Sequence, residues 1–229
     1  ALDSLKKKNY QKSKNHLEKS YTLIKNDRIS LIIAETLKQY LYVFEKNKIP
    51  DIKKNFGDFS LINEAFQRCY LDDQNTKIYF ENLINTKDNI RAEDADYSRY
   101  IFFYINYLVE DNKYQDAKEI TDNLDYLESS LLISQGKKWI ENKKLKEFQK
   151  IFSCKNPNDV VSELFFLVAN LYSSQKDFKK SNFYLNISNY LNPKFRFNLS
   201  LLAQNNYFSK NYAKTLKILE SYNKDDDFY

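Results

Sequence analysis

Few side chains in this sequence have the type and spacing that catalysis needs. The single histidine, His16, lies in a lysine-rich stretch without a second histidine, a cysteine or a carboxylate pair at ligand spacing. No Gly-x-Ser-x-Gly motif accompanies it, and two glycines in 229 residues cannot form the glycine-rich loops that bind phosphates or dinucleotides. We therefore expect no enzymatic activity, no cofactor and no metal site, and an exposed structural position for His16.

The acidic and cysteine residues also have simpler roles than metal binding or redox chemistry. Glu93, Asp94 and Asp96 precede a predicted helix, where negative charge compensates the free N–H groups of the first turn. Cys69 and Cys154 are far apart and lack Cys-x-x-Cys spacing. We expect capping from the carboxylates, and two ordinary thiols rather than a metal cage or a disulfide.

The composition indicates helices joined by short loops. Hydrophobic residues make up 42% of the chain and aromatic residues 16%, whereas there are only two glycines and three prolines to build tight turns. The net charge of +5 accompanies an abundance of Lys, Asn, Ile and Tyr together, so it is weak evidence for nucleic-acid binding. The apolar runs are too short to span a membrane.

A repeat of about 34 residues organises the elements that must position any functional side chain. Turn tripeptides with a terminal aromatic residue recur between amphipathic stretches, at Lys8-Asn9-Tyr10, Asn112-Lys113-Tyr114, Lys176-Asp177-Phe178 and Lys210-Asn211-Tyr212. A small residue follows each aromatic residue three positions later, at Ser13, Ala117, Ser181 and Thr215. This spacing places a ring and a small residue on one helix face, where two helices can cross closely.

The pattern resembles the tetratricopeptide repeat (TPR), a 34-residue helical hairpin. The best match covers residues 162–195, in which the packing positions are Phe165, Val168, Ala169, Tyr172, Phe178, Ser181, Leu185, Ser188 and Pro193. We expect one all-α domain, a right-handed superhelical α-solenoid of TPR-like hairpins, with units at about 1–24, 29–56, 59–86, 98–126, 129–153, 162–195 and 196–222. Gly136 is expected to be the small packing residue of the fifth unit.

Over its whole length the chain is similar to alphaproteobacterial TPR proteins of unassigned role. The residues that carry this resemblance are Tyr97-Ser98-Arg99-Tyr100 and the stretch from Ser162-Glu163-Leu164-Phe165 through Asn192-Pro193. The resemblance implies a bacterial protein, with a periplasmic setting where an export leader is present; a cytoplasmic setting stays open. Because Ala1 aligns inside a first helix, we expect the chain to be a piece of a longer array.

The TPR register predicts a binding groove that receives a peptide segment or a partner helix. The groove positions lie between the packing positions of each first helix, and the candidates are Phe102, Asn106, Lys137, Phe166, Asn170 and Gln204. Carboxamides can hydrogen-bond an extended backbone, and rings offer apolar pockets. Since Asn is frequent throughout the chain, its recurrence at these positions is equally expected by chance.

The alternative is an RNA-binding or other nucleic-acid-binding helical repeat that uses the lysines from Lys137 to Lys146 around Trp139, although a solvated face with a packed Trp139 is the simpler interpretation.

Overall fold

The computed structural model describes residues 1–24, 27–51, 54–85, 97–123 and 131–222. Every regular element within these ranges is an α-helix, which confirms the predicted all-α class. The helices are α1 (Leu2–Lys6), α2 (Tyr10–Ile24), α3 (Arg28–Lys46), α4 (Asp58–Leu71), α5 (Thr76–Asn85), α6 (Tyr97–Glu110), α7 (Tyr114–Asp122), α8 (Leu131–Glu141), α9 (Lys146–Ile151), α10 (Pro157–Ser174), α11 (Phe178–Leu191), α12 (Asn198–Phe208) and α13 (Tyr212–Leu219). The predicted capping carboxylates Glu93, Asp94 and Asp96 lie outside the described residues.

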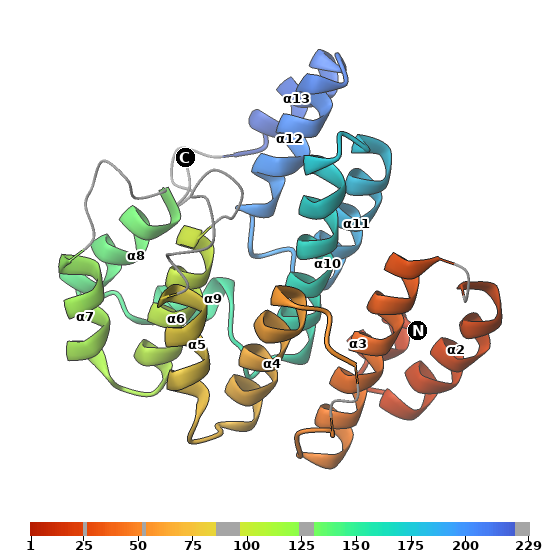
Figure 1. The fold of residues 1–229 in the computed structure, drawn as a ribbon. Coiled ribbons are helices and arrows are strands. Elements are labelled where there is room, and N and C mark those ends of the chain that lie inside the picture. The colour runs from red at the N-terminus through yellow and green to blue at the C-terminus, as the bar shows by residue number, and fades with distance from the viewer. Residues whose placement is uncertain (25–26, 52–53, 86–96, 124–130, 223–229) are drawn as a thin grey trace.

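The helices form antiparallel hairpins along the chain, with one departure from the expected units (Figure 1). The unit at 29–56 was expected to be a hairpin, but its described residues hold only the 19-residue helix α3. This helix ends at Asn47, which adopts a left-handed backbone conformation, and Pro50 follows shortly afterwards. A proline lacks the N–H group that a helix interior requires, and the described residues 48–51 and 54–57 form no second helix.

Each turn that the repeat predicted has the same backbone geometry. One residue of the turn is left-handed, with φ between 57° and 61° for Lys8, Asn112, Lys176 and Lys210, and the turns at Asp72 and Lys143, outside the predicted set, share this geometry with φ of 56° and 55°. In the turn before α11, the amide of Asp177 donates to the carbonyl of Tyr172 at 2.9 Å, and that of Lys176 donates to Ser173 at 2.9 Å. This pair of bonds is a Schellman motif, which satisfies the free carbonyls of a helix C-terminus. The same pair recurs in the other turns.

The small residues of the repeat lie where the helices of a hairpin approach each other. Ser13, Ala117 and Ser181 are all buried. At Gly136, a Cβ atom would lie 3.4 Å from the ring of Phe148 and 3.6 Å from that of Phe102. Larger side chains at these positions would push the helices apart, as the repeat pattern predicts.

The core is mainly aromatic and connects helices that are distant in sequence. Phe66 of α4 packs edge-on to Phe103 of α6, with ring centroids 5.2 Å apart, and Phe103 lies 4.4 Å from Phe152. In addition, α10 contacts α1, α3 and α4, as well as its neighbours α11 and α12. A solenoid in which each repeat touches only the next repeat would not make the contacts from α10 back to α1, α3 and α4. The N-terminal helices therefore pack against α10 (Figure 1).

Candidate functional site

The structure buries half of the predicted groove residues, so these side chains are not available to a ligand. Phe102 is fully buried and stacks on Phe148 at 5.6 Å and on Phe195 at 6.1 Å. Asn106 is also buried, and its amide donates to the carbonyl of Phe152 at 3.0 Å. The expectation that Phe102 and Asn106 contact a peptide is wrong, because α9 and Phe195 cover this face of α6.

The other predicted groove residues are divided between the core and the surface. Phe166 is buried and lies against the guanidinium group of Arg99, so it cannot contact a peptide either. Lys137 is mostly buried, with an ion pair to Asp122 at 3.8 Å. Asn170 is partly buried on α10 and Gln204 is exposed on α12. Only these last two are left as accessible members of the predicted set.

A buried ion pair joins α6 to α10. Arg99 donates to both carboxylate oxygens of Glu163, from Nε at 2.6 Å and from Nη2 at 2.5 Å, and both side chains are 1% exposed. Nη2 also donates to the Asn198 side chain at 2.7 Å. The guanidinium group lies 3.6 Å from the ring centroid of Phe166 and 4.8 Å from that of Phe195. Such a pair positions three helices and has no access to solvent, so it is structural.

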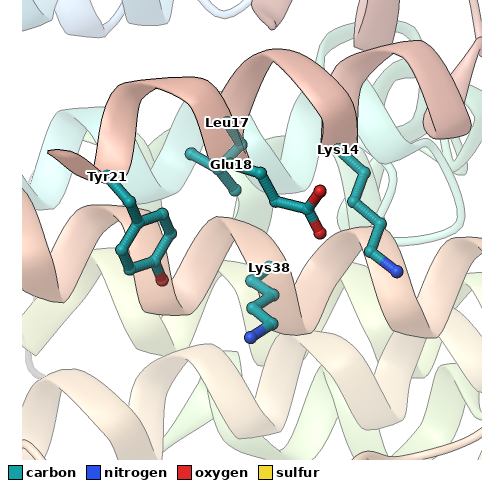
Figure 2. Close-up of a pocket in the computed structure, with 5 residues that line it drawn as sticks. All are labelled: Lys14, Leu17, Glu18, Tyr21 and Lys38. Atoms are coloured by element: carbon teal, nitrogen blue, oxygen red, sulfur yellow. The ribbon is translucent and has the colours of Figure 1, made fainter.

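An accessible groove lies instead between α2 and α3. The Asp27 side chain caps α3 by accepting from the amide of Ile29 at 3.1 Å and from the hydroxyl of Ser30 at 2.6 Å, and it thereby sets where α3 turns back along α2. The hydrogen bond from Ser30 keeps the pKa of Asp27 below its usual value. A hollow of about 220 Å³ between the two helices is lined by Lys14, Leu17, Glu18, Tyr21 and Lys38 (Figure 2).

A larger hollow of about 470 Å³ lies along α3, and Lys14 and Lys38 line both hollows. The residues that line the larger cavity are Lys14, Glu35, Lys38, Gln39, Leu41, Tyr42, Glu45, Lys46, Pro50, Asp51 and Lys54. We call the two hollows together the α2–α3 groove. Its floor is apolar, since Leu17 and Leu41 are buried side chains, and its rim carries charges of both signs.

The charges on the rim are not all neutralised within the chain. Lys54 pairs with Glu35 at 3.2 Å, and Lys46 pairs with Glu45 at 3.1 Å. Among the residues that the structure describes, Lys14 and Lys38 have no ion-pair partner. Burial raises the pKa of Tyr21, and the nearby Glu35 carboxylate raises it further. The groove therefore offers apolar surface beside two cations and the Glu18 carboxylate.

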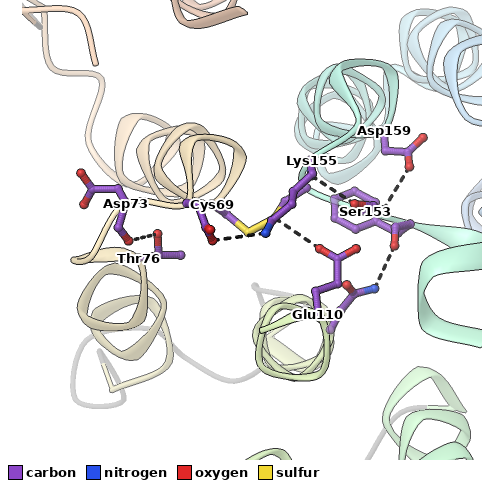
Figure 3. The surroundings of a disulfide bond; sticks show 11 residues. Cys69, Asp73, Thr76, Glu110, Ser153, Lys155 and Asp159 are labelled. Atoms are coloured by element: carbon purple, nitrogen blue, oxygen red, sulfur yellow. Dashed lines mark hydrogen bonds and ion pairs between the residues drawn. A yellow bond between two sulfur atoms is a disulfide. The ribbon is translucent and has the colours of Figure 1, made fainter. Parts of the chain in front are cut away.

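A disulfide joins Cys69 of α4 to Cys154, which follows α9 (Figure 3). The expectation of two ordinary thiols is wrong, because the fold brings residues 85 positions apart to a Cα separation of 5.8 Å, within the range that a disulfide spans. The Glu110 carboxylate lies 3.9 Å from the Cys154 sulfur. Burial raises the pKa of Glu110, and it raises that of the neighbouring Asp159 to about 6.

The lysines that were proposed to bind nucleic acid are exposed, but Trp139 among them is buried. Lys138, Lys143, Lys144 and Lys146 lie at the surface around the turn between α8 and α9. Trp139 is 2% exposed and packs edge-on to Phe148 with the ring centroids 5.0 Å apart. The basic face therefore lacks this ring as a platform on which a base could stack.

The α2–α3 groove was not predicted, because the TPR register assigns the binding positions to the first helices of later units. A signal was present in α3, where Glu35, Lys38, Tyr42 and Glu45 recur at helical spacing on one polar face. Their role depends on α2 lying beside them, which the register of the repeat does not specify.

Comparison with known proteins provides no further guide to this site. No family model, no curated protein and no solved structure matches the chain. Within the described residues, no helix is both long and apolar enough to span a membrane.

Proposed function

We propose that this chain is a non-enzymatic protein-interaction scaffold that holds a peptide segment of another protein in the α2–α3 groove. The observation that carries the proposal is the groove itself, an elongated hollow with an apolar floor and with the two unpaired cations, Lys14 and Lys38, at its centre. Clefts that combine apolar surface with a few convergent polar groups are the usual form of binding sites.

The chemistry of the groove indicates the kind of peptide. Tyr42, which is 40% exposed, offers contact to an apolar side chain, and Lys14 and Lys38 offer charge-assisted hydrogen bonds to a carboxylate. A segment with an acidic residue next to an apolar residue fits this arrangement best.

We also propose that the hairpins form a TPR-like superhelix. The 34-residue spacing and the shared turn geometry of α10–α11 and α12–α13 support it for that part of the chain. Within it, Asn170 and Gln204 stay candidates for contact with a partner, because their side chains are not fully buried.

The disulfide supports an extracytoplasmic setting as part of the same proposal. Disulfides persist in oxidising compartments such as the periplasm and are reduced in most cytosols. Protein extracted from its source in the presence of a thiol-alkylating reagent should carry no alkyl group on Cys69 or Cys154. Alkylation of both cysteines in the freshly extracted protein would contradict this setting.

A peptide-display experiment tests the proposed function. The full chain is immobilised and panned with a random 12-residue peptide library, and selected peptides are titrated by fluorescence anisotropy. Peptides with an acidic and an apolar residue should be enriched, and Lys38→Glu should weaken their binding by about tenfold or more. Lys146→Glu is the matched control, since it changes the same charge on an exposed lysine outside the groove. Equal binding by both variants would refute the proposal.

Titrations of the same kind distinguish nucleic-acid binding from peptide binding. A 12-residue uridine oligomer that contacts phosphates should lose affinity by about 0.7 log units per log unit of salt for each contact. A steep salt dependence that Lys143→Glu/Lys144→Glu abolishes would favour nucleic-acid binding over peptide binding.

A further inference from the structure

The carboxylate of Glu110 faces a sulfur atom of the disulfide. One of its oxygens lies 3.9 Å from the sulfur of Cys154 (Figure 3). A disulfide sulfur carries no proton, so it cannot donate a hydrogen bond to this oxygen. Burial also raises the pKa of Glu110, because a charged carboxylate loses hydration there. The oxidised site therefore offers this carboxylate no donor on the side of the sulfur.

The other groups around Glu110 compensate its charge only in part. A hydrogen bond from the Ser153 side chain and the charge of Lys155 favour the ionised carboxylate, whereas the charge of Asp72 disfavours it. Lys155 is itself shared, since its ammonium group pairs with Asp72 at 3.2 Å. Burial is the largest of these effects, so the pKa of Glu110 is raised on balance. An additional donor at the Cys154 sulfur would therefore stabilise the carboxylate.

Reduction of the disulfide supplies this donor. A Cys154 thiol can donate to Glu110 across a distance close to the present 3.9 Å, because sulfur is a larger atom than oxygen and its hydrogen bonds are long. A hydrogen bond to an ionised acceptor is also stronger than one between neutral groups. Glu110 thus favours the reduced form of the cysteine pair over the oxidised form.

An exposed ion pair joins the same two segments as the disulfide. Cys69 and Cys154 are 0% and 3% exposed, so a reductant reaches the bond only when the surrounding chain opens. Lys155 follows Cys154 directly and Asp72 lies three residues after Cys69, and their side chains are 45% and 60% exposed. Exposed ion pairs contribute little to stability, so the segment around Lys155 can open locally while the disulfide is intact. The ammonium group of Lys155 also attracts a thiolate, which is the attacking form of a thiol.

From these observations we infer that Cys69 and Cys154 form a reversible thiol–disulfide exchange site, which takes two electrons from a dithiol reductant. In this site Glu110 donates a proton to the Cys154 sulfur on reduction and then accepts the hydrogen bond of the resulting thiol. The three residues belong to α4, to α6 and to the segment between α9 and α10, and none of them lines the α2–α3 groove. The inference therefore goes beyond the proposed function and does not depend on it.

The exchange consists of two displacements that conserve atoms and electrons. A thiolate of the reductant attacks the Cys69 sulfur. The bond to Cys154 breaks with its electron pair on the Cys154 sulfur, which takes the proton that Glu110 has bound from solvent. The second thiolate of the reductant then attacks the reductant's own sulfur in the mixed disulfide, and Cys69 leaves and takes a proton from solvent. The dithiol is oxidised to a disulfide and releases two protons, one for each cysteine thiol that is formed.

Redox titration of the full chain in dithiothreitol buffers tests the inference. The ratio of reduced to oxidised dithiothreitol is stepped at pH 7, free thiols are trapped by alkylation and counted by mass spectrometry, and circular dichroism at 222 nm reports the fold. We expect the parent chain to be reduced while it stays folded. Glu110→Gln keeps the size of the side chain but removes its charge and its proton, so half-reduction should need a ratio about tenfold higher.

Two further measurements separate this role from a structural one. Asp159→Asn removes the other buried carboxylate of the cluster, which accepts from the amide of Ser153 at 3.0 Å, and it should change the ratio by no more than about twofold. In the Cys69→Ser chain Cys154 is the remaining thiol. Its S–H stretching band in the infrared should move to higher frequency when Glu110→Gln is added, because the hydrogen bond is weakened. Glu110→Leu provides the same comparisons if the glutamine variant does not fold.

The inference is overturned if the parent disulfide is reduced only where the circular dichroism signal is lost, because it would then be a structural cross-link alone. It is also overturned if Glu110→Gln and the parent are half-reduced at the same ratio, if Asp159→Asn shifts the ratio as far as Glu110→Gln does, or if the S–H band stays in place. None of these measurements involves a peptide ligand, so the Lys38→Glu test of the α2–α3 groove can succeed or fail independently.

Discussion

Glu163→Gln is a single change of charge that tests how the middle of this fold is held together. Glu163 accepts two hydrogen bonds from Arg99, and both side chains are 1% exposed. Glutamine has nearly the same shape, so the packing of α10 is retained. One oxygen can still accept from Nε of Arg99, but the new amide NH₂ group faces the donor Nη2, and the positive charge loses its counter-charge.

The structure sets the size of the effect. Removal of one partner of a buried ion pair typically costs about 3–5 kcal/mol, because the remaining charge stays buried without compensation. Neither the nearby rings nor a further hydrogen bond of Arg99 offsets this cost. The rings of Phe166 and Phe195 lie on the guanidinium group at 3.6 and 4.8 Å, but a ring quadrupole contributes only about 2 kcal/mol. Nη1 of Arg99 has no hydrogen-bond partner among the described residues.

Urea unfolding at pH 7, followed by circular dichroism at 222 nm without a reducing agent, measures the change in the free energy of unfolding. Arg99→Met/Glu163→Leu is the matched variant, because it removes both charges and keeps the volume apolar. Buried ion pairs replaced in this way are often neutral or stabilised by about 1–4 kcal/mol. We expect the double variant to be much more stable than Glu163→Gln.

Two results would refute this reasoning. A cost below about 1 kcal/mol for Glu163→Gln would mean that the site is not desolvated as the burial indicates. A double variant as unstable as Glu163→Gln would mean that the loss comes from packing and not from an uncompensated charge.

Three further perturbations have defined outcomes. Burial raises the pKa of Asp159 from 3.8 to about 6, so the folded chain binds this proton more tightly than the unfolded chain and stability falls as pH rises through that range. In urea unfolding, Asp159→Asn should therefore be more stable than the parent by about 3 kcal/mol at pH 7 and equal to it near pH 4. A difference in stability that does not change with pH would contradict this. Cys69→Ser/Cys154→Ser opens an 85-residue loop and should lower the free energy of unfolding by about 4.5 kcal/mol, and reduction of the parent should have the same effect; equal stability of reduced and oxidised chains would disagree. Lys176 has a left-handed backbone with φ of 61°, so Lys176→Gly should stabilise the folded chain by about 0.5–1 kcal/mol. Lys179→Gly, in α11, should destabilise it by about 1 kcal/mol in the same thermal melts. The opposite order would show that the backbone at Lys176 is not strained.

The sequence predicted the features of this fold that depend on local interactions. Tyr10, Tyr114, Phe178 and Tyr212 were expected to begin second helices, and they are the first residues of α2, α7, α11 and α13. A turn with a left-handed residue and a helix that starts two positions later involve only neighbouring residues. Trp139 was expected to be packed, and it is buried.

The features that were missed depend on contacts between distant segments. Phe102 and Asn106 occupy groove positions in the register, but the segment between α11 and α12 brings Phe195 onto the ring of Phe102. The partners Arg99 and Glu163 are 64 residues apart. The spacing of a repeat specifies which residues share a helix face, but it does not specify which other segment folds back onto that face.

The disulfide also affects how the protein would respond to mechanical force. Because Cys69 and Cys154 are bonded, a load applied between the ends of the chain passes through the sulfur atoms and bypasses the 85-residue loop between them. That loop contains α5–α9, including the rings of Phe102, Phe103 and Phe148. A fully extended chain would be shorter by roughly 300 Å than the reduced chain. An oxidised molecule under tension can therefore lose its terminal hairpins while the covalently closed middle bears no load.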